Sequence, residues 1–102
     1  MKLKKYIILC LITSLTGGLS AQKTMTGIEV LKKDNFKILE RKRVGLITNP
    51  TGVDNSLKST IDILFEAPNV NLVALYGPEH GVRGDVHAGD KVENSTDPST
   101  GL

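Results

Sequence analysis

The sequence predicts an α/β protein organised around a parallel βαβ unit. Two short apolar runs, "RVGLIT" at residues 43–48 and "NLVALY" at residues 71–76, have the length and composition of buried strands. A helical pattern lies between them, at residues 60–67. Because a strand, a helix and a second strand follow in this order, we expect the two strands to be parallel, with a right-handed crossover.

The segment before the first strand predicts two short helices. Ile28 and Leu31, followed by Phe36 and Leu39, recur at helical spacing, and Thr26 is a suitable N-cap for the first helix. The "DN" dipeptide after "LKK" separates the two helices.

The sequence marks the boundaries of the strands and the helix in the βαβ unit. Charged residues precede its first strand, and the following "NPTGVDNSLK" is dense in turn-forming residues, so it predicts a loop. The helix has Ser59 or Thr60 as its cap and is stopped by Pro68. Its buried face is expected to hold Ile61, Leu64 and Phe65. From residue 77 onward the sequence predicts no helix or strand.

The first 21 residues have the layout of a secretory signal peptide. A basic start precedes an apolar stretch from Tyr6 to about Leu15, and small residues near Ala21 suit cleavage there. A membrane anchor is the alternative, but the apolar stretch is only about half of the ~20 residues that cross a bilayer. We therefore expect residues 1–21 to be removed on export from a bacterial cell. Residues 22–102 would then be periplasmic or secreted, with no stable membrane anchor.

Removing this segment changes the charge and the cysteine content. The chain has 13 Lys+Arg and 11 Asp+Glu, and three lysines lie in the segment, so 10 − 11 leaves a net charge of about −1. That balance argues against nucleic acid as a partner. The only cysteine, Cys10, also lies in the segment, which leaves no disulfide within the mature part. Because residues 22–102 can bury only a small core, we expect them to be the front of a larger protein.

Polar loops follow both predicted strands, "TNPTG" after the first and "GPEHGVRGD" after the second. Ligands of an open parallel sheet bind beyond the carboxyl ends of its strands, so we expect the loops to lie side by side and to form the site. Glu79, tethered to the strand end beside His80, is the candidate general acid, a role that partial burial would suit. A surface glutamate that caps a turn is the competing interpretation. Asn49 is either a ligand contact or a turn residue that binds its own backbone.

The sequence predicts no nucleotide and no metal. "GVDNSLKS" has the position of a phosphate-binding loop, but Leu57 stands where that loop needs a glycine. His80, Asp85, His87 and Asp90 are metal-ligand residue types, yet their spacing matches no compact metal motif. We therefore expect no cofactor.

Three stretches, "RVGLITNPTGVD", "STIDILFEAPNVNLVALYGPEHGVRGD" and "GDKVENSTDPSTGL", closely resemble the opening of the exo-β-N-acetylmuramidase family. The resemblance runs from about Gly27 to Leu102, roughly the first quarter of a family member. It implies a Rossmann-like N-terminal domain of a larger two-domain protein, with the substrate cleft between the domains. It also implies release of N-acetylmuramic acid from the non-reducing end of peptidoglycan fragments, in cell-wall recycling. The family's catalytic glutamate falls on Glu79, with His80 beside it.

The implied substrate gives roles to Arg83 and Asp85. N-acetylmuramic acid carries a lactyl ether that ends in a carboxylate, and a guanidinium can bind a carboxylate through two parallel hydrogen bonds. Arg83 would then bind the substrate, with Asp85 orienting it. The competing interpretation is an internal ion pair between Arg83 and Asp85 that touches no sugar.

Two alternatives remain for the function of the chain. One is a non-catalytic sugar-binding fragment, and the other is a metal-dependent hydrolase of another bond. We expect residues 22–102 on their own to be inactive, because a second catalytic group and much of the sugar site would lie in the remainder of the larger protein.

Overall fold

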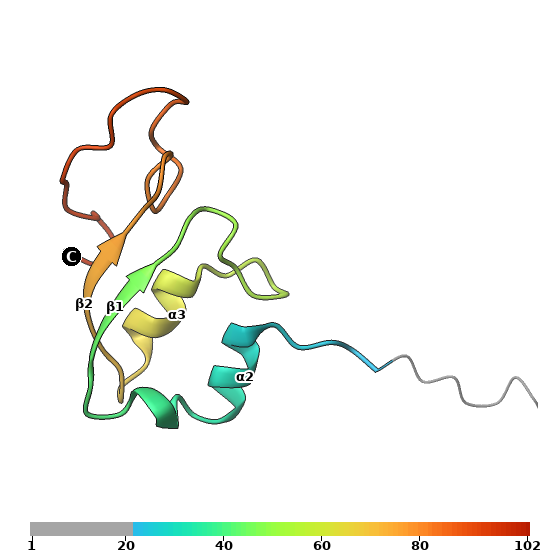
Figure 1. Ribbon diagram of the computed structural model, residues 1–102. Coiled ribbons are helices and arrows are strands. Elements are labelled where there is room, and N and C mark those ends of the chain that lie inside the picture. Colours follow the sequence, from blue (N-terminus) through green and yellow to red (C-terminus); the bar gives the residue numbers. More distant parts are fainter. Residues whose placement is uncertain (1–21) are drawn as a thin grey trace, which may run out of the picture.

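The computed structural model describes residues 22–102, so the predicted signal peptide at residues 1–21 lies outside the described residues. The elements are α2 (Gly27–Lys33), the 3₁₀ helix η1 (Lys37–Leu39), β1 (Arg43–Ile47), α3 (Thr60–Glu66) and β2 (Asn71–Tyr76). Figure 1 shows α3 beside the two strands, and the chain after β2 looping outward and returning to the sheet. No helix in this part of the chain is long and apolar enough to cross a membrane.

The two strands pair in parallel. Arg43 lies opposite Asn71 at one end of the register, and Ile47 lies opposite Tyr76 at the other. The bounds of β2 are those predicted, and β1 ends one residue earlier than expected. Because α3 connects the strands, the predicted parallel βαβ unit and the α/β fold class are confirmed.

Local capping explains where the helices begin. The backbone N–H of Thr26 donates to Oε2 of Glu29 at 2.8 Å, the reciprocal half of a capping box at the start of α2. The Oγ of Ser59 accepts from the backbone N–H of Ile61 at 3.2 Å, which identifies Ser59 as the cap of α3. The second predicted helix is shorter than expected: Phe36 has a left-handed φ of 53°, and only the three-residue η1 follows it.

The core lies between the helices and the sheet. It consists of Ile28, Phe36, Ile63, Leu64, Ala67 and Leu72. On α3 the predicted face is partly wrong, because Phe65 is 45% exposed while Ile63 is buried. The buried stripe continues to Ala67, four residues after Ile63, so the helix turns that side to the core and Phe65 outward.

The strands are not buried on both faces, contrary to the prediction. Val44 and Leu46 pack against the core, but Ile47 is 79% exposed and Tyr76 is 58% exposed. Alternate residues of a strand point to opposite faces, and within residues 22–102 the core covers one face of β1. The branched, apolar composition therefore indicated a strand correctly but overestimated its burial.

Candidate site at the carboxyl edge of the sheet

The loops after the two strands lie in contact, as predicted. The backbone N–H of Thr48, directly after β1, donates to the carbonyl of Tyr76 at 3.0 Å. Farther out, Gly84 has a φ of +80°, and a Cβ added there would lie 2.6 Å from Cγ of Pro50. Both loops leave the same end of the sheet in Figure 1. The polar residues that follow the strands are thus brought to one edge.

The loop after β2 is closed by its own hydrogen bonds. The N–H of Gly81 donates to the carbonyl of Pro78 at 2.9 Å, and the N–H of Val86 donates to the carbonyl of His80 at 3.3 Å. The Nδ1 of His80 lies 3.0 Å from the carbonyl oxygen of Val86. A carbonyl oxygen only accepts, so Nδ1 carries the hydrogen and is the donor in this contact.

Glu79 lies at the outer turn of this loop. Its side chain is exposed in the structure of residues 22–102, so the expected partial burial of Glu79 is wrong for this part of the chain. The turn from Pro78 to Gly81 carries residue 79 outward, while the inner side of the loop is packed. A Cβ added at Gly77 would lie 2.5 Å from the backbone nitrogen of Val82. The role of Glu79 as an acid stays a prediction.

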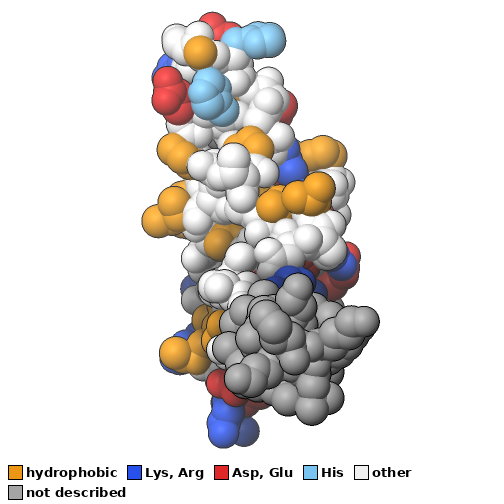
Figure 2. Space-filling view, turned by 90° about the vertical axis from the view of Figure 1, so that its right-hand side faces the viewer, with side chains coloured by type: hydrophobic (Ala, Val, Ile, Leu, Met, Phe, Trp, Pro, Cys, Tyr) orange, Lys and Arg blue, Asp and Glu red, His pale blue; other side chains and the backbone are white. Residues whose placement is uncertain are grey.

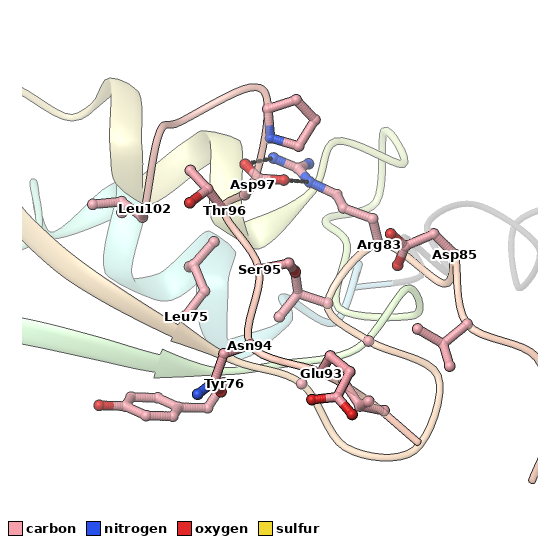
Figure 3. A pocket seen from close by; sticks show the side chains of 16 residues that line it. Leu75, Tyr76, Arg83, Asp85, Glu93, Asn94, Ser95, Thr96, Asp97 and Leu102 are labelled. Atoms are coloured by element: carbon pink, nitrogen blue, oxygen red, sulfur yellow. Dashed lines mark hydrogen bonds and ion pairs between the residues drawn. The ribbon is translucent and has the colours of Figure 1, made fainter. Parts of the chain in front are cut away.

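Arg83 is held by two carboxylates. Its Nε donates to Oδ1 of Asp97 at 2.9 Å, and its Nη2 donates to Oδ2 of Asp97 at 3.0 Å and to Oδ1 of Asp62 at 2.8 Å. Figure 3 shows the guanidinium turned toward Asp97. The side chain of Asp97 is only 3% exposed, whereas that of Asp62, on α3, is 35% exposed. Arg83 therefore links the loop after β2 to α3 and to the C-terminal segment.

The predicted ion pair of Arg83 with Asp85 is wrong. The Arg83 guanidinium reaches away to Asp97 and Asp62, and within residues 22–102 no ion pair joins it to Asp85. The Asp85 carboxylate folds back over Gly81, where an added Cβ would lie 2.8 Å from its Oδ1. Substrate contacts of Arg83 and Asp85 stay predictions.

Asp97 is the residue that sequence reasoning missed. Its Oδ2 also accepts from the backbone N–H of Thr100 at 3.1 Å and from the Thr100 hydroxyl at 2.8 Å. The hydrogen bonds from Arg83 are the main cause that lowers the pKa of Asp97 to about 2, against the opposing effect of burial. The same pairing raises the pKa of Arg83. The "DPST" stretch is a recognisable turn signal, because Asp side chains accept from backbone groups that follow them.

A cavity of about 430 Å³ opens beside this network. Its wall runs from the end of β2 through residues 81–86 to residues 92–98 and Leu102. Of the predicted site residues, Arg83 and Asp85 line the cavity, whereas Asn49, Glu79 and His80 do not. The predicted cluster is therefore split between the cavity and the outer side of the loop.

Asn49 has the geometry of a turn residue. Its Oδ1 accepts from the backbone N–H of Thr51 at 3.1 Å and from the Thr51 hydroxyl at 2.7 Å. The side chain thus closes the turn after β1, and a ligand contact of Asn49 stays a prediction.

The histidines and acids of the loop after β2 do not form a metal centre. Figure 2 shows two histidine side chains near acidic side chains at one end of the molecule. Among residues 22–102, however, no three His, Cys, Asp or Glu side chains are grouped as metal ligands would be.

Three comparisons relate the chain to known proteins. Residues 44–102 match the family described as "Exo-beta-N-acetylmuramidase NamZ, N-terminal". Over 80 residues the chain is 58% identical to the peptidoglycan beta-N-acetylmuramidase NamZ of Bacillus subtilis (strain 168), covering 78% of this chain and 19% of that protein. The crystal structure of a DUF1343 family protein from Bacteroides fragilis NCTC 9343 is similar with a TM-score of 0.67 and 78% identity. That similarity covers 76% of this chain and 18% of the Bacteroides protein. The chain thus spans about a fifth of the length of these relatives.

Proposed function

Because the chain belongs to the family of exo-β-N-acetylmuramidase NamZ N-terminal domains, we propose that it is part of an exported glycoside hydrolase. The enzyme removes N-acetylmuramic acid from the non-reducing end of peptidoglycan fragments. Residues 1–21 direct export to the periplasm, and the reaction serves cell-wall recycling. Family membership and the 58% identity to a peptidoglycan β-N-acetylmuramidase support this proposal.

The observation that carries the chemistry is the position of Glu79. It follows β2 by three residues, at the edge where open parallel sheets bind ligands, and its side chain is exposed. An accessible carboxyl group there protonates the glycosidic oxygen as the bond breaks. His80 is the next residue, and its Nε2 is the ring nitrogen available for a substrate contact, because Nδ1 is engaged with the carbonyl of Val86.

The test is Glu79→Gln in the complete enzyme, assayed with a chromogenic β-N-acetylmuramide. We expect kcat to fall by about 10²- to 10⁴-fold, the usual contribution of acid–base assistance, while substrate binding is nearly retained. Glu66→Gln is the matched control, because Glu66 is an exposed glutamate of α3 paired with Lys58. Turnover at the wild-type rate in the Glu79 variant would refute the assignment.

Two further arms of this assay separate the alternatives. A non-catalytic sugar-binding protein would bind the muramide without releasing the chromophore. A metal-dependent hydrolase would lose activity in the presence of a chelator and regain it on adding a divalent metal. We expect turnover of the muramide with and without chelator, and little turnover of the corresponding glucosaminide.

A further inference from the structure

We propose that Asp97 is a positioning residue for the glycosidase reaction, acting through Arg83 on the loop that carries Glu79. This inference rests on the proposed function and adds to it a residue that does not touch the substrate. It also gives one purpose to two separate motifs, "GPEHGVRGD" and "STDPSTGL", which meet at the Arg83–Asp97 pair.

Asp97 is held in place by hydrogen bonds of its backbone and of its side chain. Its backbone N–H donates to the carbonyl of Leu102 at 2.7 Å, and its carbonyl accepts from Gly101 at 2.8 Å. The side chain of Leu102 packs against the hydrophobic core. With Thr100 bonded to the buried carboxylate as well, Asp97 is held from both its backbone and its side chain.

The loop needs an attachment of this kind. Gly81 and Gly84 flank Arg83 with φ values of +75° and +80°, and the hydrogen bonds of His80 with Val86 close the loop only on itself. Arg83 bonds the loop to the rest of the fold through two of its nitrogens. A reacting group displaced by about 1 Å can cost ~10²-fold in rate, so this anchor bears on catalysis.

Asp97 is the stronger of the two anchors. It takes two hydrogen bonds from the guanidinium in a fork arrangement and is 3% exposed, whereas Asp62 takes one and is 35% exposed. In Asp97→Asn, one of the two carboxylate oxygens that accept from Arg83 becomes an amide N–H₂ group, which cannot accept a hydrogen bond. One of the two bonds to Arg83 is then lost, and the loop loosens.

The experiment compares Asp97→Asn with Asp54→Asn in the complete enzyme. Asp54 is a matched control: its side chain is 4% exposed, accepts from the backbone and hydroxyl of Ser56, and pairs with Lys32. It connects the loop after β1 to α2 rather than to the Glu79 loop. We expect both variants to have a lower Tm, but only Asp97→Asn to lose kcat, by about 10- to 100-fold, with KM little changed.

A double variant separates positioning from general loosening. If Asp97 acts through Glu79, adding Asp97→Asn to Glu79→Gln causes little further loss of kcat, because the group being positioned is already gone. Multiplied losses, a wild-type kcat for Asp97→Asn, or an equal kcat loss in Asp54→Asn would each overturn the proposal. Wild-type turnover by Glu79→Gln would instead refute the catalytic role of Glu79, and a complete wild-type enzyme that does not turn over the muramide would refute the proposed function itself.

Two milder substitutions keep the test decisive if Asp97→Asn fails to fold. Thr100→Val removes the 2.8 Å hydroxyl bond to the carboxylate, together with the longer 3.3 Å bond that the hydroxyl accepts from the backbone N–H of Leu102, and should lower kcat by a smaller factor. Arg83→Lys keeps the charge but loses the fork, and positioning predicts equal losses on muramide and glucosaminide substrates. An unchanged kcat in folded Thr100→Val and Arg83→Lys enzymes, or a loss in Arg83→Lys confined to the muramide, would contradict the positioning role.

Discussion

Gly77 joins β2 to the loop that carries Glu79, and Gly77→Ala is the most direct perturbation of the site. A Cβ at this position would lie 2.5 Å from the nitrogen of Val82, and 2.6 Å and 2.9 Å from the carbonyl carbon and Cα of Gly81. All three atoms belong to the backbone, so no side chain can rotate away. The φ of Gly77 lies outside the left-handed region, so the substitution acts through this clash.

The magnitude follows from the distances. Ordinary contacts of a Cβ begin at 3.4 Å, so relief of the 2.5 Å contact requires the two limbs of the loop to separate by about 1 Å. Glu79 is two residues from the new methyl group and moves with its limb. A displacement of that size can cost ~10²-fold in rate, so we expect kcat on the chromogenic muramide to fall by about 100-fold.

The assay is steady-state turnover of the complete enzyme, with the thermal unfolding midpoint measured in parallel. Gly89→Ala is the control: its φ of +86° makes alanine strained, but no atom lies within 4 Å of the added Cβ. That variant should lose some stability and keep its kcat. Wild-type turnover by Gly77→Ala would show that the loop tolerates the shift and would refute the argument from packing.

Three other outcomes are expected. Because the folded pKa of Asp97 is about 2, below its ordinary value of 3.8, its stabilising effect is present above about pH 4 and is lost as the pH falls toward 2. Urea unfolding of the complete protein across this range should show the loss, and Asp97→Asn should flatten it; identical profiles would contradict the assignment. Ser59→Ala removes the cap of α3 and should cost about 1 kcal/mol in unfolding free energy, whereas the neighbouring Lys58→Ala loses only an exposed ion pair with Glu66 and should cost less. Residues 22–102 alone should unfold without a sharp transition, since Ile47 and Tyr76 leave apolar surface exposed on a two-stranded sheet; a cooperative calorimetric transition from the monomer would argue against this.

The βαβ unit was accessible from the sequence because its signals are local. Strand β2 and the start of α3 follow from apolar runs, a serine cap and a proline stop, each readable within a few residues. Parallel pairing then follows from connectivity, and the meeting of the two loops follows from parallel pairing. Burial was predicted less well, since the exposure of Ile47 and Phe65 depends on which faces other parts of the fold cover.

The partners of Arg83 were decided only by the tertiary structure. Its charge and its place in a glycine-rich loop indicated an ion pair, and the nearest acid along the chain, Asp85, was the natural candidate. The Asp85 carboxylate lies over Gly81, and the buried turn of the C-terminal segment brings Asp97 to the guanidinium instead. Residue types determine that a partly buried cation needs an anion, but only the path of the backbone determines which carboxylate reaches it.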